Sequence, residues 1–383
     1  MSEPSPATAI VVGAGIGGLC AAIALARAGI EPLVFERSPD LAPLGAGLTL
    51  WPNALHALRA IEAGAVLEAE SAALAASIRD WRGRTLARSD GAELERRFGV
   101  PSIVVHRSEL HKVLLGALAP IRPRLGACLE RLEQDGGGVT ARFEDGSEAC
   151  ADLLVGADGV DSTVRRLLLA DGQPRYAGYI GWRAVTRFDP SRVVAAESWG
   201  PGSVFGMLPL AGERLYWFGT RPAPAGAHDE GPERRKRDVL ERFAGWHDPI
   251  AEVVESTAPA DVLRHDIVDR PPRRGWSQGR VSLLGDAAHP MTPHLGQGAC
   301  QAIEDAVVLG RCLDGARDVA QALRDYESRR FERTARIVAR SRRIGQVSQW
   351  QSPLARGARD ALLRRLPERV QLDQLADVVG FRA

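Results

Sequence analysis

Apolar and polar positions near the N-terminus follow the order strand, turn, helix, strand. An apolar run ends at the glycine-rich segment 13–18, residues 19–28 have helical spacing, and a second apolar strand over residues 32–35 ends at Glu36. A strand, a glycine turn, a helix, a strand and an acid within about thirty residues are typical of a dinucleotide-binding βαβ unit. The pattern therefore predicts a nucleotide site in this part of the chain.

The glycines and the acid of this unit have separate expected roles. Gly13 permits the tight turn, Gly15 lets backbone amides approach a pyrophosphate, and Gly18 lets the helix pack close to the sheet. Glu36 is expected to accept hydrogen bonds from the adenosine ribose, and its charge repels a 2′-phosphate, which favours FAD or NAD over NADP. Taken alone, the glycine pattern could also be a chance glycine-rich turn.

Shorter elements follow this unit. Residues 48–50 predict a short strand, and residues 52–64 predict a helix that starts at a proline. Ser108 is expected to cap a helix over residues 108–118. A β-meander with glycine-rich turns then leads into a buried strand over residues 152–156.

The pattern changes over residues 175–270, where aromatic and β-branched residues dominate. Strands are expected over residues 176–187, 203–209 and 214–220, which predicts a mostly antiparallel sheet in a second domain. We assign five of the eight tryptophans to this inserted section, namely Trp182, Trp199, Trp217, Trp246 and Trp276.

The chain then returns to the first kind of pattern. A buried strand is expected over residues 281–285 and a helix over residues 299–313, so the first domain is discontinuous and the sheet domain is inserted into it. From Asp318 the pattern is helical and arginine-rich, with breaks at Pro353 and Pro367. A helix that packs on the protein or a dimer partner is favoured for this tail over one that lies on a membrane surface.

Composition narrows the class of protein. The 383 residues are too many for one ordinary core and predict two domains. The charges balance, 49 basic against 48 acidic, so neither nucleic acid nor an anionic membrane is expected as a partner. The five cysteines form no CxxC pair, which argues against a disulfide scaffold, a zinc site or a dithiol centre, and no metal site is predicted. A charged leader region and an uncharged apolar span of ~18 residues are both missing, so a cytoplasmic protein is expected.

Two further motifs turn the nucleotide prediction into a flavin prediction. Residues 156–165 read GADGVDSTVR, and residues 285–298 read GDAAHPMTPHLGQG. With these motifs the chain resembles the single-component FAD-dependent aromatic hydroxylases, the family of p-hydroxybenzoate, salicylate and urate hydroxylases and zeaxanthin epoxidase. All three motifs occur in the family's order over residues 9–313.

The resemblance implies an α/β fold. It consists of a Rossmann-type FAD-binding domain like that of p-hydroxybenzoate hydroxylase, an inserted, mainly antiparallel β-sheet substrate domain, and a C-terminal helical tail. The expected boundaries are 1–75, 100–174 and 275–340 for the FAD-binding domain, 76–99 and 175–274 for the substrate domain, and 341–383 for the helical segment.

The resemblance also implies cofactor contacts. Asp286 would accept hydrogen bonds from the ribityl hydroxyls of FAD, unless it is a helix cap, and Arg107 would bind the pyrophosphate, unless it is solvated. Amides of residues 296–298 would face the pyrimidine edge of the isoalloxazine. Asp158 and Arg165 belong to a motif that supports FAD and the nicotinamide nucleotide, although capping is nearly as good an explanation for Asp158. The predicted FAD-binding residues are Gly13, Gly15, Gly17, Gly18, Glu36, Arg37, Ala46, Arg107, Asp158, Asp286, Gly296, Gln297 and Gly298.

Substrate residues are expected on the inserted sheet. The predicted lining is Trp182, Arg183, Tyr216, Trp217 and the loop around Pro293, with Tyr216, Arg183 and Pro293 as the candidate catalytic residues. Tyr216 matches a catalytic tyrosine of the urate hydroxylase branch, but the basic residue of that branch appears here as Gly202 or Ser203, which argues against urate. His289 and His294 are expected only to hydrogen-bond within their loop.

The implied reaction uses NADH or NADPH to reduce FAD. O2 then adds at flavin C4a, and the hydroperoxide transfers oxygen to a small aromatic or heteroaromatic substrate. Because no second glycine fingerprint is present, the nicotinamide nucleotide would bind only transiently. Epoxidation of an alkene, an FAD dehydrogenase or reductase that does not use O2, and a non-enzymatic FAD protein stay as alternatives; the loop 296–298 favours the two oxygenase reactions. A monomer and a homodimer are both compatible with the sequence.

Overall fold

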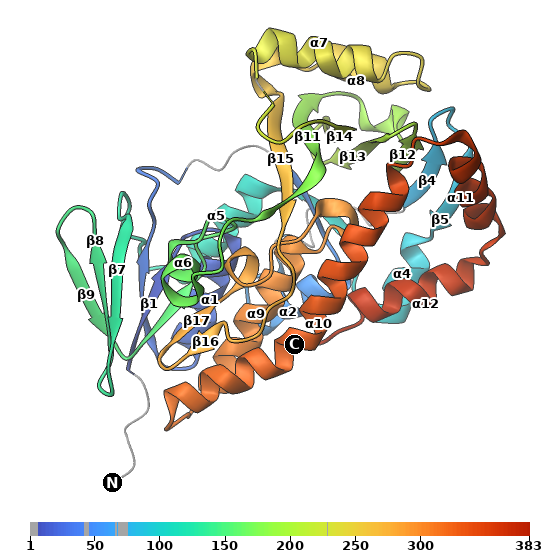
Figure 1. The fold of residues 1–383 in the computed structure, drawn as a ribbon. Helices are drawn as coiled ribbons and strands as arrows, with labels where there is room; N and C mark the ends of the chain where they lie inside the picture. The colour runs from blue at the N-terminus through green and yellow to red at the C-terminus, as the bar shows by residue number, and fades with distance from the viewer. Residues whose placement is uncertain (1–6, 42–45, 66, 68–75, 228) are drawn as a thin grey trace.

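A five-stranded sheet forms the centre of the first domain (Figure 1). The computed structural model describes residues 7–383 except 42–45, 66, 68–75 and 228. Four strands run parallel beside one another, and the short β16 closes one edge antiparallel. The order is β16 (Ser277–Gln278), β17 (Val281–Leu283), β10 (Leu153–Gly156), β1 (Thr8–Val12) and β2 (Glu31–Phe35).

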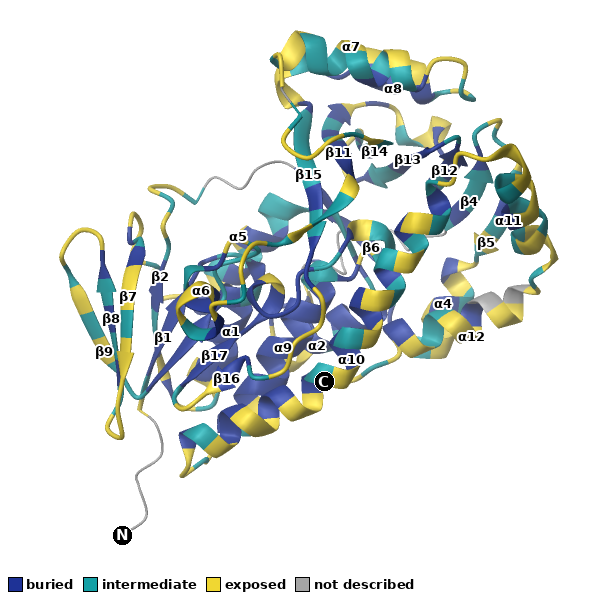
Figure 2. Ribbon diagram, in the orientation of Figure 1, coloured by how far each residue is buried: buried dark blue, intermediate teal, exposed yellow. Residues whose placement is uncertain are grey.

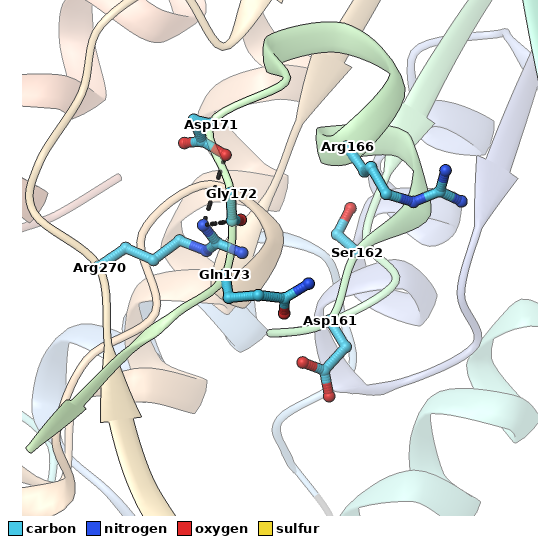
Figure 3. A pocket seen from close by; sticks show the side chains of 7 residues that line it. All are labelled: Asp161, Ser162, Arg166, Asp171, Gly172, Gln173 and Arg270. Carbon is cyan, nitrogen blue, oxygen red and sulfur yellow. Dashed lines mark hydrogen bonds and ion pairs between the residues drawn. The ribbon is translucent and has the colours of Figure 1, made fainter.

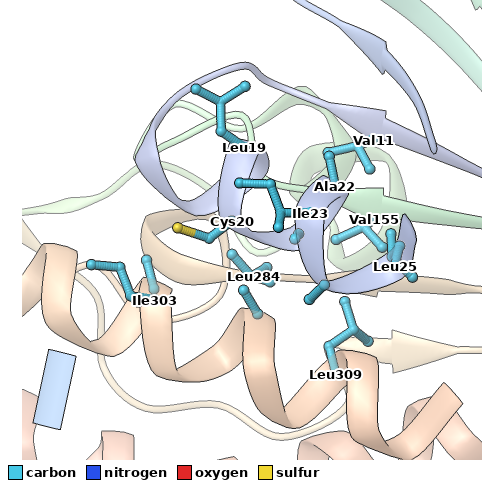
Figure 4. Close-up of a cluster of buried hydrophobic side chains, with 14 of the residues drawn as sticks. Val11, Leu19, Cys20, Ala22, Ile23, Leu25, Val155, Leu284, Ile303 and Leu309 are labelled. Carbon is cyan, nitrogen blue, oxygen red and sulfur yellow. The ribbon is translucent and has the colours of Figure 1, made fainter. Parts of the chain in front are cut away.

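Two helices bury the face of this sheet. Helix α1 (Ile16–Arg27) and helix α9 (Gly298–Leu313) are almost wholly buried, as Figure 2 shows. They approach closely because Gly310 has no side chain: a Cβ there would lie 3.0 Å from the Cβ of Ala24. The cluster in Figure 4 joins both helices to the sheet through Leu19, Ile303 and Val155. The predicted βαβ unit is thus part of one continuous apolar core.

Smaller elements surround this core. Strands β3 and β6 pair antiparallel, and the predicted meander forms a separate three-stranded sheet. The elements are β3 (Gly47–Leu50), α2 (Pro52–Ala60), α4 (Gly91–Phe98), β6 (Ile103–His106), α5 (Arg107–Leu118), β7 (Leu129–Gln134), β8 (Val139–Phe143), β9 (Glu148–Ala151) and α6 (Thr163–Leu169).

The predicted end of one helix and the predicted start of another were wrong. Helix α2 ends at Ala60 rather than near Gly64. Helix α5 is capped by His106, not by Ser108, because the Nδ1 atom of His106 accepts a hydrogen bond from the backbone N–H of Ser108. The side chain of Glu109 accepts from the backbone N–H of His106 in return, which completes a reciprocal cap. The helix therefore begins at Arg107.

The inserted segment forms a seven-stranded sheet that lies above the first sheet in Figure 1. Strands β4 and β5 join it because β4 pairs parallel with β12. The order is β15 (Leu263–Asp269), β11 (Arg175–Arg187), β14 (Arg214–Pro222), β13 (Ser203–Leu210), β12 (Ala196–Gly200), β4 (Ala76–Asp80) and β5 (Thr85–Ser89). Helices α7 (Pro232–Arg242) and α8 (Ile250–Glu255) cover its outer face.

The tryptophans of this segment do not all lie in one core. Trp182 and Trp217 pack under α7 and α8 in a second apolar cluster, where Trp217 stacks on Phe205 with ring centroids 5.4 Å apart. Trp276 instead belongs to the core of the five-stranded sheet, beside Phe331. Its assignment to the inserted sheet was wrong because the chain has already returned to the first domain at residue 276.

The C-terminal tail consists of three helices that pack on the protein. Helix α10 (Val319–Ser348) lies against α9, and helices α11 (Pro353–Arg365) and α12 (Glu368–Val379) lie against β5. The predicted breaks fall where the structure has them, since Pro353 is in the first turn of α11 and Pro367 precedes α12. In the described ranges no helix is both long and apolar enough to cross a membrane.

Removing the Trp217 side chain should destabilise the inserted domain. The indole is fully buried and donates a hydrogen bond to Thr257 at 2.9 Å. We expect Trp217→Ala to lower the free energy of unfolding by about 3–5 kcal/mol, measured by urea denaturation followed by circular dichroism. Trp350→Ala, which changes a 40% exposed tryptophan, should have a much smaller effect. Equal losses in the two variants would contradict this account of the second core.

Candidate active site

The glycine turn after β1 is shaped by close backbone contacts. Gly13 has a φ of +104°, and a Cβ there would lie 2.4 Å from the carbonyl oxygen of Ala157. A Cβ at Gly18 would lie 1.8 Å from the carbonyl oxygen of Gly13, and one at Gly17 would lie 2.9 Å from Leu284. At Gly15 the Cβ position is open, with nothing within 4 Å. The turn is therefore tight against the protein and accessible on the side of Gly15.

The carboxylate of Glu36 lies at this turn. It accepts hydrogen bonds from the backbone N–H of Ala14 at 2.7 Å and of Ser38 at 2.9 Å. The imidazole of His111 is 2.8 Å from the carbonyl oxygen of Ala14 and fixes the same turn from α5. Sequence analysis missed His111; its only signal was its place on the helix that Arg107 begins. Arg37 is exposed beyond β2.

The polar side chains of the second motif form hydrogen bonds within the protein. The carboxylate of Asp158 accepts hydrogen bonds from the Ser162 hydroxyl and the Val164 backbone N–H, which is the capping role considered as its alternative. Arg165 is 2% exposed, pairs with Asp171, and donates to the carbonyl oxygens of Ala287 and Ala288. This motif therefore links α6 to the third motif.

A pocket of about 160 Å³ lies beside the second motif (Figure 3). In it, the Arg270 guanidinium contacts the carboxylate of Asp171 and the carbonyl oxygen of Gly172. Pockets that bind drug-sized ligands usually measure about 300–1,000 Å³, so this hollow is too small to hold a whole dinucleotide. Its lining is Asp161, Ser162, Arg166, Asp171, Gly172, Gln173 and Arg270.

The carboxylate of Asp286 in the third motif is exposed and available to a ligand. It lies in a short 3-10 turn, and within the described ranges no group donates a hydrogen bond to its side chain. Solvent reaches the side chain, yet burial of its surroundings raises the pKa of Asp286, while His289 and Arg107 lower it. Its Oδ1 atom is 3.9 Å from where a Cβ of Gly298 would lie, so Asp286 stands beside the start of α9. It is not a helix cap.

The loop before α9 is held by hydrogen bonds between buried side chains and is exposed to solvent at Gly296. Gly296 has a φ of +59° and is exposed, and Gln297 beside it is 1% exposed. The side-chain amide oxygen of Gln297 accepts hydrogen bonds from the side chains of Asn53 at 3.0 Å and Gln301 at 2.8 Å. The indole nitrogen of Trp51 is buried without a partner, 3.1 Å from the Cβ position of Gly296. Asn53, Gln301 and Trp51 were not predicted to matter.

Helices α9 and α10 share a buried network of charged side chains next to this loop, and sequence analysis also missed it. Glu304 and Asp305 on α9 face Arg330 and Arg333 on α10, with N–O distances of 2.5–2.8 Å. Burial would raise the pKa of Asp305, but the charges of His289 and Arg330 lower it to about 2. The His289 side chain is 2.6 Å from Asp305, so its partner lies on α9, and the expectation that it bonds only within its loop was wrong.

Arg107 joins the third motif to the inserted sheet. Its backbone N–H donates to the carbonyl oxygen of Ala46 at 2.8 Å, which holds the start of α5 against β3. Burial and the nearby charge of Arg183 lower the pKa of Arg107, while Asp286 raises it. Arg107 is therefore half-buried and within reach of the charges of both Asp286 and Arg183, and it is not a solvated surface arginine.

The predicted substrate residues lie on opposite faces of the seven-stranded sheet. Tyr216 packs towards the first domain, with its ring over Gly47, where a Cβ would lie 2.4 Å from the tyrosine Cγ. Arg183 lies on the same face, and its charge acts on Tyr216 and Arg107. Trp182 and Trp217 point into the core under α7 and α8, so their assignment to the substrate lining was wrong. Alternation along the strands separates the two pairs.

The loop of Pro293 is tied to the same face of the sheet. Pro293 is exposed, and the next residue, His294, is 2.8 Å from the Tyr179 hydroxyl on β11. Burial lowers the pKa of His294 to about 4, so the imidazole is neutral near pH 7. Glu197 on β12, which sequence analysis did not single out, acts on the Tyr216 hydroxyl together with Arg183. The structure thus brings Arg183, Tyr216 and Glu197 to one face.

These residues fit the FAD that the motifs imply. The open turn at Gly15, the free carboxylate of Asp286 and the exposed Gly296 are groups that the fold leaves available. The orphaned Trp51 nitrogen lies at the same loop. Asp286 would bind the ribityl hydroxyls, and the amides of residues 296–298 would face the ring.

Removing the Arg330 side chain should destabilise the protein, because this guanidinium pairs with both Glu304 and Asp305. Arg330→Met leaves two buried carboxylates with only part of their partners, so we expect a loss of about 3–5 kcal/mol in the free energy of unfolding. Arg329→Met changes an exposed neighbour on the same helix and should cost less than about 0.5 kcal/mol in urea denaturation. Similar stability of the two variants would refute the role given to the network.

Removing the Asp286 carboxylate should weaken FAD binding and leave the fold intact. We expect Asp286→Ala to cost about 1.5–3 kcal/mol in the binding free energy of FAD, because charge-assisted hydrogen bonds are lost. Fluorescence titration of the apoprotein with FAD measures this cost, and circular dichroism checks the fold. Asp161→Ala, at the surface pocket, is the matched control. An unchanged FAD affinity in Asp286→Ala would exclude the ribityl contact.

Comparison with known proteins identifies the family. The family model described as "FAD binding domain" matches residues 6–341. The chain is 43% identical to the aurachin C monooxygenase/isomerase of Stigmatella aurantiaca (94% of each chain) and 38% identical to the 3-amino-4-hydroxybenzoate 2-monooxygenase of Streptomyces cremeus (88% of this chain, 86% of the other). It is also similar to Klebsiella pneumoniae HpxO, solved with FAD and uric acid, with a TM-score of 0.91 and 33% identity over 97% of this chain and 96% of the other. With its three motifs and a match over most of its length, the chain belongs to the single-component FAD-dependent aromatic hydroxylases.

Proposed function

We propose that this protein hydroxylates a small aromatic or heteroaromatic compound, with FAD as cofactor and NADH or NADPH as reductant. The observation that carries the proposal is the free carboxylate of Asp286 beside the Gly298 end of α9, opposite a sheet face that bears Arg183 and Tyr216. FAD, when bound and reduced, supplies the electrons with which one atom of O2 is transferred to the substrate.

Residues of the first domain bind and orient the cofactor in this proposal. Glu36 binds the ribose, Arg107 the pyrophosphate, and Asp286 the ribityl chain. The first turn of α9 directs its N–H groups and the positive end of its dipole at the flavin ring, which favours the negative charge of the reduced state. The loop is held by Gln297, so the N–H groups are oriented before the cofactor reacts.

Residues of the inserted sheet orient the substrate. Tyr216 is the candidate to hydrogen-bond a substrate oxygen: burial raises the pKa of its hydroxyl to about 12, so it is neutral near pH 7 and can donate. The positive charge comes from Arg183 on β11, since Gly202 and Ser203 carry none. This difference supports a substrate other than urate.

We extend the proposal to the organisation of the protein. The FAD-binding domain comprises residues 1–75, 100–174 and 275–340, the substrate domain residues 76–99 and 175–274, and the helical segment residues 341–383. The protein works in the cytoplasm, as a monomer or homodimer, without nucleic acid as a partner. Cysteines that are all free support a reducing compartment.

Oxygen-coupled turnover tests the proposed function. We expect the FAD-loaded protein to oxidise NADH or NADPH faster when a suitable aromatic compound is added, with matching O2 uptake and a product heavier by one oxygen atom. An epoxide in the product mixture would favour alkene epoxidation. Stimulated oxidation of NAD(P)H without O2 uptake would favour a dehydrogenase or reductase.

Replacing the Tyr216 hydroxyl should alter catalysis without loss of FAD. If the hydroxyl orients the substrate or exchanges a proton with it, Tyr216→Phe should lower the hydroxylation rate by about 10²–10⁴ or uncouple NAD(P)H oxidation from product formation. The control is Tyr176→Phe, whose hydroxyl donates to the carbonyl oxygen of Ala223 on the same sheet. Equal turnover and equal coupling in Tyr216→Phe and the wild type would remove Tyr216 from the site.

A further inference from the structure

One row of paired residues crosses four strands of the substrate sheet and ends in opposite charges. Glu197 on β12 pairs with Gly206 on β13, Gly206 pairs with Phe218 on β14, and Phe218 pairs with Arg183 on β11. Directly paired residues project from the same face of a sheet. Three strand spacings separate the ends of the row, so the Cα atoms of Glu197 and Arg183 are roughly 14 Å apart.

The middle of the row is a flat surface formed by an aromatic ring that lies over a glycine. Gly206 contributes no side chain, and the Phe218 ring covers it so closely that a Cβ at Gly206 would lie 2.2 Å from the ring. The Tyr216 ring lies next to Phe218, with centroids 5.9 Å apart. A flat apolar area with an acid at one end and a base at the other matches the shape of a planar ring with polar edges.

Both ends of the row lack a charged protein partner. In the part of the chain that the structure describes, Glu197 accepts one hydrogen bond, from the Trp199 indole at 3.1 Å, and takes part in no ion pair. The Nε atom of Arg183 is buried without a hydrogen-bond partner. Its neighbour His265 cannot serve as a counter-ion, because an imidazole is either neutral or positive; burial and the Arg183 charge lower the pKa of His265 to about 4 and leave it neutral. Buried polar groups without partners are costly, so a ligand is the natural partner for both.

Tyr216 lies between the two ends. Tyr216 is two residues from Phe218 on β14 and so projects from the same face as the row, and the charges of both Arg183 and Glu197 act on its hydroxyl. The Tyr216 ring packs over Gly47 of the first domain, and the charge of Arg183 acts on Arg107, which begins α5 there. The row therefore faces the domain that binds the cofactor.

We propose that Glu197 and Arg183 are specificity-determining residues that bind opposite edges of one planar substrate. Arg183 binds an acidic oxygen, such as a phenolate or enolate, and Glu197 accepts a hydrogen bond from an N–H group on the ring or attached to it. The substrate class is thus an electron-rich aromatic or heteroaromatic ring that carries both an ionisable oxygen and a nitrogen-bound hydrogen. Arg183 stabilises the ionised form, which is the form that is most readily attacked by an electrophilic oxygen. This inference rests on the proposed function.

Two series of probes, each lacking one group at a time, test the inference. The first is 4-hydroxy-2-quinolone, its N-methyl derivative and 2-quinolone; the second is 4-aminophenol, whose two groups lie on opposite edges, its N,N-dimethyl derivative and aniline. With the FAD-loaded wild type, we expect the complete compound of at least one series to be preferred about 10- to 100-fold in kcat/KM over both truncated compounds, the range of a hydrogen bond to a charged group. No binding of either complete compound, measured by perturbation of the flavin absorbance, would overturn the substrate class.

Variants at the two ends assign each group to its residue. In Glu197→Gln the Trp199 N–H occupies the amide oxygen, so the amide NH2 faces the substrate and should abolish the preference for N–H over N-methyl. Arg183→Gln should abolish only the preference for the hydroxylated compound. Arg187→Gln, at the exposed end of β11, should change neither preference. FAD content should be equal in all variants.

The outcomes separate the inference from the proposed function. In one outcome the wild type turns over with O2 uptake while Glu197→Gln keeps the preference for N–H over N-methyl and Arg183→Gln keeps the preference for the hydroxylated compound. That result would refute the inference but not the proposed function. A wild type that binds FAD but shows no O2-coupled turnover with any aromatic compound would refute the proposed function. A preference lost from the expected variant and kept in Arg187→Gln would support both.

Discussion

The buried contact between two acids on α9 and two arginines on α10 is the constraint on which the rest of the site depends. Glu304, Asp305, Arg330 and Arg333 are charged residues with little or no contact with water, and their desolvation is costly. The cost is offset because hydrogen bonds satisfy both carboxylates from several sides, Asn53 and His289 included. Apolar residues could hold two helices together as well; what the charges add is a fixed register between α9 and α10.

That register sets the geometry of both flavin loops. Asp305 accepts a hydrogen bond from the backbone N–H of Gly285, immediately before Asp286. One turn earlier on α9, Gln301 bonds both Gln297 and Glu304, which connects the loop before the helix to the same charges. Asp286 and the loop 296–298 are thus positioned by Asp305 and Gln301, which lie one turn apart on the same helix. A shift of α9 along its axis would move both together, so their mutual distance is protected even where the loops are exposed.

Sequence reasoning recovered what is encoded locally and missed what depends on distant partners. The βαβ unit, the meander and the breaks at Pro353 and Pro367 follow from short-range patterns, and the structure contains them. The two faces of the inserted sheet could not be told apart, because both are buried and alternation alone does not say which one meets the cofactor. Arg183 and Trp182 were therefore grouped together. Glu197 and the Arg330 network gave no local signal, since their partners lie on other strands or helices.

The two halves of the site satisfy their polar groups in opposite ways. On the cofactor side, Gln297 and Glu36 are held by protein hydrogen bonds, while the Asp286 carboxylate and the Trp51 indole nitrogen have no protein partner in the described part of the chain. On the sheet side, Arg183 and Glu197 are left short of partners next to apolar rings. A cofactor that stays bound can rely on a frame that is largely held by protein hydrogen bonds, whereas a substrate that comes and goes must supply partners that the free protein lacks. The cost of those unsatisfied groups is regained only when a ring with matching edges binds, and selectivity for the substrate follows from that difference.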